Sequence, residues 1–210
     1  GGSLTCLIGS NGLGKTTLLR TLAGFQPALS GEINLVIGEQ SHRLDVLSRA
    51  HLSRLVSIVL TEKIDVTHIT VNEMVGMGRM PYTGFWGLQS EADRLVVSEA
   101  LHDVGISSLA QRDVSTLSDG ERQKVMIAKA QAQQTPVVLL DEPTAFLDYP
   151  SKVNMMKLLA EMAHEQGKIV LLSTHDLDIA LRYSDQLLTM DEGLKFVTKD
   201  ALAAELDRLK

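Results

Sequence analysis

Residues 9–16 read Gly9-Ser10-Asn11-Gly12-Leu13-Gly14-Lys15-Thr16, and this stretch decides the fold. The apolar run Leu4–Ile8 before it predicts a buried strand, and Lys15–Ala23 after it predicts a helix. A strand, a G-x-x-x-x-G-K-[ST] loop and a helix together are typical of a phosphate-binding loop. Glycines let the backbone curl so that its N–H groups point inward, and the helix directs its positive dipole end at the same place.

The loop also predicts individual contacts with a nucleoside triphosphate. We expect Lys15 to neutralise the β- and γ-phosphates and to act in catalysis, and the hydroxyl of Thr16 to bind Mg²⁺. The other expected nucleotide contacts are Gly9, Ser10, Asn11, Gly12, Leu13, Gly14 and Thr17. The loop alone is equally compatible with a kinase or a GTPase.

A pair of carboxylates follows a second apolar run. Val137–Leu140 predicts a buried strand, and Asp141 and Glu142 come directly after it. Ligands of open α/β sheets bind at the carboxyl ends of the strands. We therefore expect Asp141 to hold Mg²⁺ and Glu142 to polarise an attacking water molecule.

Predicted strands alternate with predicted helices along most of the chain, which indicates an α/β fold with a mainly parallel sheet covered on both faces. The strands are expected at Leu4–Ile8, Glu32–Ile37, Leu55–Leu60, Val137–Leu140, Ile169–Leu172, Gln186–Met190 and Leu194–Thr198. The helices are expected at Lys15–Ala23, Ser48–Leu52, Thr70–Gly78, Ser90–Asp103, Gly120–Gln133, Ser151–Gln166, Leu177–Tyr183 and Thr198–Lys210.

Two departures from this alternation divide the chain further. Asp191-Glu192-Gly193 predicts a hairpin, and hence an antiparallel β segment. From Thr70 to Gln134 only helices are predicted, which indicates a helical insert. We expect an α/β core formed by residues 1–75 and 134–210, and a helical subdomain formed by residues 76–133.

Composition argues against several classes of protein, although it does not exclude a local basic groove. The net charge of −6 argues against a general nucleic-acid-binding protein, which usually carries a basic patch. The apolar runs fall well short of the ~20 residues that a membrane-spanning helix needs. One cysteine, Cys6, excludes an internal disulfide framework and fits a reducing compartment.

Three further motifs occur in a fixed order and carry a family resemblance. Residues 117–123 read Leu-Ser-Asp-Gly-Glu-Arg-Gln, which resembles the signature motif of ABC-type ATPases with Asp119 in place of the usual first glycine. Thr144–Asp148 resembles the D-loop of that family, and Ser173–Asp176 resembles its switch-histidine motif. A capped helix would explain Ser118 by itself, but the three motifs together are highly specific.

The resemblance implies a P-loop NTPase (RecA-like) core that binds ATP and Mg²⁺ and pairs with a second copy of itself. It implies that Ser118 and Gly120 complete the site of the other copy, that Asp148 lies at the nucleotide, and that His175 holds the attacking water and the γ-phosphate. Thr61 stands where the family usually has a glutamine at the metal, so we expect Thr61 to offer that oxygen, with Glu62 as the other candidate.

Residues 69–84 resemble a segment of importer ATPases for iron-siderophores, haem and cobalamin. This implies an integral membrane permease as partner, a substrate-binding protein as an indirect one, no nucleic acid, and a peripheral location on the cytoplasmic face of the inner (plasma) membrane. Tyr82, Phe85 and Trp86 form a candidate docking patch. The alternative is a non-transport ABC-type ATPase of DNA repair or translation, although no coiled-coil heptads occur between Gly14 and Leu117.

The loop also lies early in the chain, with room for one preceding strand. We therefore expect a trimmed chain, and the aromatic residue that stacks on adenine in this family has no counterpart before Gly9.

Overall fold

The computed structural model describes the chain except residues 1, 11, 62–65, 85–86, 192 and 203–210. Its strands form a six-stranded sheet of order β4-β5-β6-β1-β7-β8 and a separate two-stranded sheet, β2-β3. The strands are β1 (Ser3–Ile8), β2 (Asn34–Ile37), β3 (Gln40–Arg43), β4 (Val56–Val59), β5 (Val137–Leu140), β6 (Ile169–Thr174), β7 (Gln186–Thr189) and β8 (Lys195–Val197).

The main sheet is parallel from β4 through β7, and only β8 runs antiparallel, against β7. This arrangement confirms the predicted α/β class with a mainly parallel sheet and an antiparallel segment. The strand β1, which leads into the phosphate-binding loop, lies between β6 and β7 in the interior of the sheet. Both of its edges are therefore hydrogen-bonded, and the start of the loop is held rigidly.

Side-chain alternation along the strands divides the hydrophobic core between the two faces of the sheet. In β5, Val137 and Leu139 pack with Leu19 of the first helix. Val138 and Leu140 point the opposite way and belong to a larger cluster on the other face, which includes side chains of α6. Helices therefore cover both faces, and all four residues of β5 are buried.

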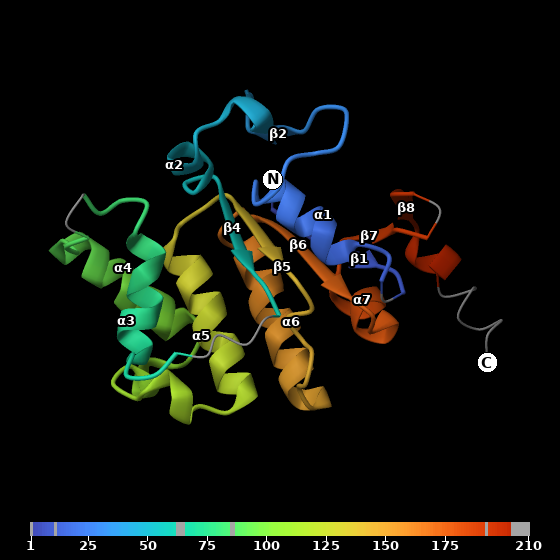
Figure 1. Cartoon of the computed structure of the whole chain (residues 1–210). Helices are drawn as coiled ribbons and strands as arrows, with labels where there is room; N and C mark the ends of the chain where they lie inside the picture. The colour runs from blue at the N-terminus through green and yellow to red at the C-terminus, as the bar shows by residue number, and fades with distance from the viewer. Residues whose placement is uncertain (1, 11, 62–65, 85–86, 192, 203–210) are drawn as a thin grey trace.

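The α-helices are α1 (Lys15–Leu22), α2 (Arg49–Leu52), α3 (Val71–Gly76), α4 (Glu91–Asp103), α5 (Asp119–Ala132), α6 (Tyr149–His164) and α7 (Leu177–Tyr183). The helices α3, α4 and α5 pack against one another and lie together at one side of the sheet (Figure 1). One hydrophobic cluster runs without a break from these helices to β1 and β6. The predicted boundary between the core and the helical subdomain, after residue 75, falls inside α3. The division of the chain into these two parts stays a prediction.

A buried arginine fastens the end of the α3 segment to the other two helices. Arg79 donates to Asp93 of α4 (Nε to Oδ1, 2.8 Å) and to the carbonyl oxygen of Ala132 at the end of α5 (2.8 Å). Its guanidinium carbon lies 4.1 Å from the ring centroid of Tyr82, whose hydroxyl donates to the carbonyl of Gln133. These contacts hold the chain after α3 in one position on the surface.

The structure corrects several predicted boundaries. The strand β3 was missed, although Gly38, with φ of 59°, makes the two-residue turn that joins it to β2. The helix predicted over Thr70–Gly78 ends as α-helix at Gly76 and continues as a 3₁₀ turn, Met77–Arg79. Of the helix predicted over Thr198–Lys210, residues 199–202 are helical and the rest lie outside the described residues.

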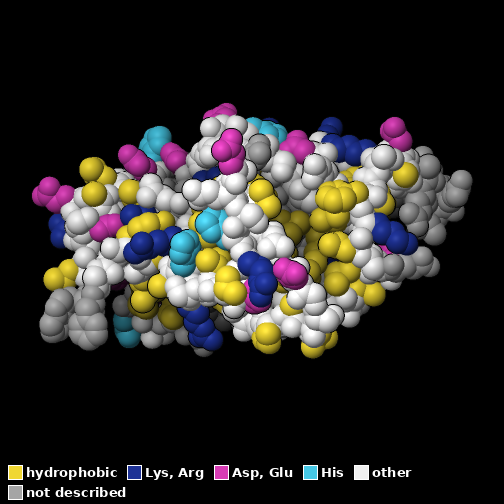
Figure 2. Space-filling model, turned by 90° about the horizontal axis from the view of Figure 1, so that it is seen from above, with side chains coloured by type: hydrophobic (Ala, Val, Ile, Leu, Met, Phe, Trp, Pro, Cys, Tyr) yellow, Lys and Arg dark blue, Asp and Glu magenta, His cyan; other side chains and the backbone are white. Residues whose placement is uncertain are grey.

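The end of the molecule near β2 and α2 exposes several hydrophobic side chains. Phe25, Leu29, Val36 and Val46 are all more than half exposed. Figure 2 looks onto this end and shows hydrophobic side chains interspersed with charged groups of both signs. Within the described residues, no helix has both the length and the apolar character needed to cross a membrane.

Candidate nucleotide-binding site

The predicted site residues follow neighbouring strands at the same edge of the sheet. Thr61 follows β4, Asp141 and Glu142 follow β5, His175 follows β6, and Gly9 follows β1. The sheet order β4-β5-β6-β1 sets these strand ends side by side. Parallel strands present their carboxyl ends at one edge, so segments far apart in the sequence meet there.

The phosphate-binding loop has the backbone that its glycines predict. Gly12 and Gly14 have φ of 88° and 95°, a region that residues with a side chain rarely adopt. The helix α1 begins at Lys15, and its first N–H groups have no capping side chain at Gly14. Such free N–H groups at a helix N-terminus form an anion-binding site. Asn11 lies outside the described residues.

The amino group of Lys15 lies inside the loop. Its Nζ atom donates to the carbonyl oxygens of Gly9 (2.7 Å) and Ser10 (3.2 Å) and lies 3.9 Å from Oε1 of Glu142. The Lys15 side chain is only 7% exposed, which weakens screening by water. A positive charge therefore stands between the loop and the carboxylate that follows β5.

Thr16 and Asp141 place two oxygen atoms next to each other. The Thr16 hydroxyl donates to Oδ2 of Asp141 over 2.7 Å, and the Thr61 hydroxyl donates to the backbone carbonyl of Asp141 over 2.7 Å. Hydroxyl and carboxylate oxygens are the ligands that Mg²⁺ prefers in proteins. The pair Thr16 and Asp141 thus fits a magnesium ion, and the hydroxyl of Thr61 contacts the backbone of the same aspartate. Glu62 lies outside the described residues.

Glu142 is held at both its backbone and its carboxylate. Its Oε2 atom lies 2.6 Å from Nδ1 of His175, and its N–H group donates to the hydroxyl of Ser173 over 2.9 Å. The side chain of Glu142 is 17% exposed, whereas that of His175 is 60% exposed. The carboxylate therefore lies at the floor of the site and the imidazole lies at its rim.

Ser118 and Gly120 of the signature motif line a different hollow from the one that Glu142 lines. Ser118 caps α5 in a capping box with Glu121, and the N–H and hydroxyl of Ser118 lower the pKa of the Glu121 carboxyl. Asp148 caps α6 by accepting from the N–H of Ser151 (3.2 Å), and hydrogen bonds from Ser151 lower its pKa. The side chain of Leu147 lies beside Gly120. Among the described residues, no hydrogen bond or ion pair joins these motifs to the phosphate-binding loop.

Comparison with known proteins places this geometry in a family. A family model described as "ABC transporter" matches residues 1–145, which is more than half of the chain. The chain belongs to the ABC transporter family. This confirms the resemblance seen in the signature and switch-histidine motifs. The chain, called the cassette from here on, is an ATPase of this family.

The relatives of the cassette include transport proteins of bacteria and archaea. It is 40% identical over 195 residues to the achromobactin transport ATP-binding protein of Dickeya dadantii (strain 3937), covering 93% of this chain and 71% of that protein. It is 39% identical over 192 residues to a cobalamin import ATP-binding protein of Halobacterium salinarum, covering 91% of this chain and 47% of that protein. The cassette thus spans about half the length of the second relative.

A solved structure shows the same fold in a dimer. The dimeric structure of a bacterial ABC transporter cassette is 26% identical to this chain, with a TM-score of 0.75 over 90% of this chain and 81% of the other.

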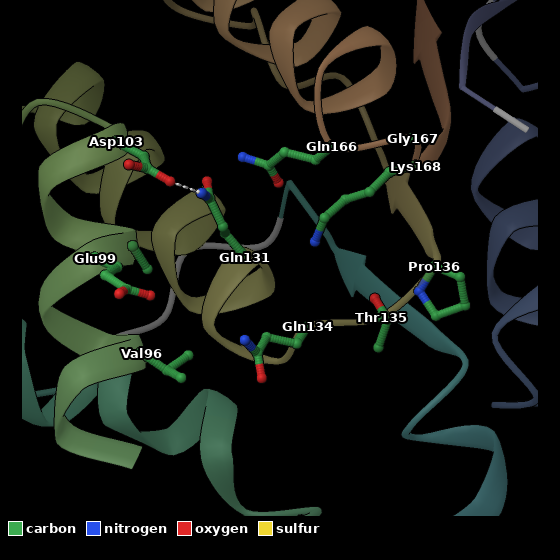
Figure 3. Close-up of a pocket in the computed structure, with 11 residues that line it drawn as sticks. Val96, Glu99, Asp103, Gln131, Gln134, Thr135, Pro136, Gln166, Gly167 and Lys168 are labelled. Carbon is green, nitrogen blue, oxygen red and sulfur yellow. Dashed lines mark hydrogen bonds between the residues drawn. The ribbon is translucent and has the colours of Figure 1, made fainter. Parts of the chain in front are cut away.

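The cassette also has a cavity that lies away from the candidate nucleotide-binding residues. A cavity of about 450 Å³ opens between α4, the end of α5 and the segments that lead into β5 and β6 (Figure 3). Pro136 and Lys168 line it and precede their strands, so the cavity lies at the amino ends of β5 and β6. The nucleotide-binding loop lies at the carboxyl ends, and the cavity is therefore distinct from it.

Sequence reasoning did not single out Ser173 for a role of its own. The signal was its position, because Ser173 directly follows the predicted strand Ile169–Leu172 and stands two residues before His175.

Proposed function

We propose that the cassette hydrolyses ATP to power import of an iron-chelate, haem or cobalamin type of substrate through a membrane permease. The observation that carries the hydrolytic part is the contact of Glu142 with His175 beside Lys15, at the end of the strand that also bears Asp141. The transport of achromobactin and of cobalamin by the two relatives supports the importing part.

The phosphate contacts come from the loop and the start of α1. The backbone N–H groups of residues 9–17 surround the phosphates, and Lys15 neutralises charge on the β- and γ-phosphates. In this proposal Lys15 leaves the carbonyl oxygens of Gly9 and Ser10, to which it now donates. Asn11 and Leu13 would contact the phosphates as members of the loop, and Thr17 would do so from the first turn of α1.

Thr16 and Asp141 would hold Mg²⁺, with Thr61 supporting Asp141 from its backbone side. The ion supplies charge neutralisation at the β- and γ-phosphate oxygens when it is bound. Asp141 is only 5% exposed. A buried carboxylate with fixed partners keeps its geometry, which suits a metal ligand.

Glu142 acts on water in this proposal. Its carboxylate accepts a hydrogen bond from the attacking water, orients it towards the γ-phosphate, and takes up its proton as the new bond to the γ-phosphorus forms. The bond between the γ-phosphorus and the bridging oxygen of the β-phosphate breaks in the same step, and ADP and phosphate are the products. His175 holds the Glu142 carboxylate through Nδ1, and its position at the rim lets it reach the γ-phosphate. Lys15 stabilises the negative charge that spreads over the phosphate oxygens.

The site needs a second copy of the chain. Ser118, Gly120 and Asp148 are separated from the loop of their own molecule, and the dimeric structure of the bacterial relative supports completion of the site across a dimer. Ser118 caps α5 and Gly120 lies in its first turn, so both lie at a helix N-terminus, where an anion is favoured.

The partner surface that we propose for the permease follows α3. Met80 and Leu88 are 69% and 79% exposed, and we propose that they form part of this contact surface. Arg79 and Tyr82 brace this segment against α4 and α5. Phe85 and Trp86 of the predicted docking patch lie outside the described residues. The cassette would then act at the cytoplasmic face of the membrane, served indirectly by a substrate-binding protein.

The test of hydrolysis is Glu142→Gln, with Glu99→Gln on α4 as the matched control. We expect Glu142→Gln to bind ATP and to dimerise with it, but to release phosphate about 10²–10⁴-fold more slowly. The Glu99→Gln variant, which changes an exposed carboxylate outside the site, keeps the wild-type rate. Near-normal turnover of Glu142→Gln would exclude the proposed base.

The test of import uses the cassette with the permease that co-purifies with it, reconstituted in vesicles. Uptake of a ferric siderophore, haem or cobalamin that requires ATP, and that stops with Glu142→Gln, supports the proposal. An ATPase that DNA or ribosomes stimulate, and that binds no membrane subunit, contradicts it.

A further inference from the structure

One buried hydroxyl joins both residues of the carboxylate pair. The Ser173 Oγ atom donates to Oδ1 of Asp141 over 2.7 Å and accepts from the N–H of Glu142 over 2.9 Å. Ser173 has no exposed surface and lies near the end of β6, next to β5 in the sheet. A hydroxyl has one proton to donate and lone pairs to accept, so both bonds are made at once.

The hydrogen bond to Asp141 selects the rotation of its carboxylate. Ser173 engages Oδ1, and the hydroxyl of Thr16 engages Oδ2. The two bonds approach opposite oxygens, so the carboxylate cannot turn without breaking one of them. Ser173 thereby keeps Oδ2 directed at Thr16, where the proposed metal would lie.

The hydrogen bond from Glu142 fixes an uncommon backbone conformation. Glu142 has φ of 48°, in the left-handed region that residues with a side chain seldom adopt. Such a conformation persists where surrounding contacts determine it. Its N–H group bonds to Ser173, and its carbonyl accepts from the N–H of Ala145 (3.0 Å).

Ser173 near the end of β6 and His175 directly after β6 both act on Glu142. Ser173 reaches the backbone of Glu142, while His175 reaches its carboxylate. The end of β6 therefore holds Glu142 at two points.

We propose that Ser173 is a positioning residue for ATP hydrolysis, which sets the carboxylate of Asp141 and the backbone of Glu142 relative to each other. This inference rests on the proposed roles of Asp141 and Glu142. Ser173 is fully buried, and it acts through its hydrogen bonds to these two residues.

The experiment compares Ser173→Ala, Ser173→Cys and Ser173→Thr in the full chain. The alanine variant lacks both hydrogen bonds, the thiol of the cysteine variant bonds weakly at similar volume, and threonine retains the hydroxyl. Ser57→Ala is the matched control, because Ser57 is a buried serine on β4 whose hydroxyl bonds to Thr135 and to the carbonyl of Val137.

We expect kcat of the alanine and cysteine variants to fall about 10–100-fold, since small misplacement of reacting groups has effects of this size. The Kd for ATP without metal stays within about twofold, because the loop is unchanged. The Mg²⁺ concentration for half-maximal rate rises in both variants. Threonine restores kcat, and Ser57→Ala leaves kcat and the Mg²⁺ dependence unchanged.

Wild-type kcat in folded Ser173→Ala or Ser173→Cys overturns the inference. An equal loss in Ser57→Ala also overturns it, because the effect would then be one of general stability. Glu142→Gln is measured in parallel. If it keeps its activity, the proposed function fails; if it is inactive while the Ser173 variants are fully active, the positioning role alone fails.

Discussion

The Nδ1 atom of His175 lies 2.6 Å from Oε2 of Glu142, although 33 positions separate the two residues along the chain. They meet because β5 and β6 are parallel neighbours, paired from Val137 with Ile169 to Leu140 with Leu172. Each residue follows its strand closely, so the register of two strands determines a contact between two side chains at the phosphate-binding loop.

The role of the contact between His175 and Glu142 can be tested with the variant His175→Ala. Without the imidazole, the Glu142 carboxylate loses its partner and its orientation, and we expect phosphate release to slow at least about tenfold. His102→Ala on α4 is the control, because that side chain is 86% exposed. Equal rates for the two variants would contradict the role of His175.

A comparison of alanine variants at the two capping residues Ser118 and Ser90 distinguishes an effect on stability from an effect on ATP hydrolysis. Each accepts from the N–H three residues on and closes a capping box, with Glu121 and Asp93 respectively. Substitution of either serine by alanine should lower the free energy of unfolding by about 1 kcal/mol. Only Ser118→Ala should also lower ATP hydrolysis measured at protein concentrations that allow dimerisation. Similar hydrolysis by both variants would exclude Ser118 from the composite site.

Gly78 lies where α3 approaches the end of α5. A Cβ atom added there would collide with the backbone carbonyl of Lys129 and come within 3.2 Å of the Ala132 side chain. We expect Gly78→Ala to lower the free energy of unfolding by about 1–3 kcal/mol, because the helices must move apart. Gly84→Ala, where a Cβ atom meets open space, is the control. Urea denaturation of both variants checks the difference.

We expect Asp93 to make the free energy of unfolding depend on pH under acidic conditions. Hydrogen bonds from the Ser90 hydroxyl and then from the Arg79 guanidinium lower its pKa to about 2. The ionised form therefore stabilises the folded state fully above the ordinary aspartate pKa of about 4, and this contribution declines as the pH falls towards about 2. The difference in unfolding free energy between wild type and Asp93→Asn should shrink over that interval. A difference that is unchanged down to pH 2 would contradict this.

Most strands and helices could be predicted from local patterns. The residues of β5 and of α7 match their predicted ranges, because a fully buried strand and a short capped helix have strong local signals. β3 was missed because Gln40–Arg43 is polar and lies mostly at the surface. Hydrophobic alternation, the usual signal of a strand, is absent where a strand packs on little core.

The sequence by itself determined the chemistry at residues 9–16, because glycines, a lysine and a threonine at that spacing form a phosphate-binding loop in any chain that places a strand before them and a helix after. It also determined the presence of carboxylates after Val137–Leu140. Only the tertiary structure decided that Ser173 bridges Asp141 and Glu142, because that contact depends on the pairing of β5 with β6 and on the φ of 48° at Glu142. Local patterns carry no information on which strands become neighbours, and the packing of the sheet supplies it.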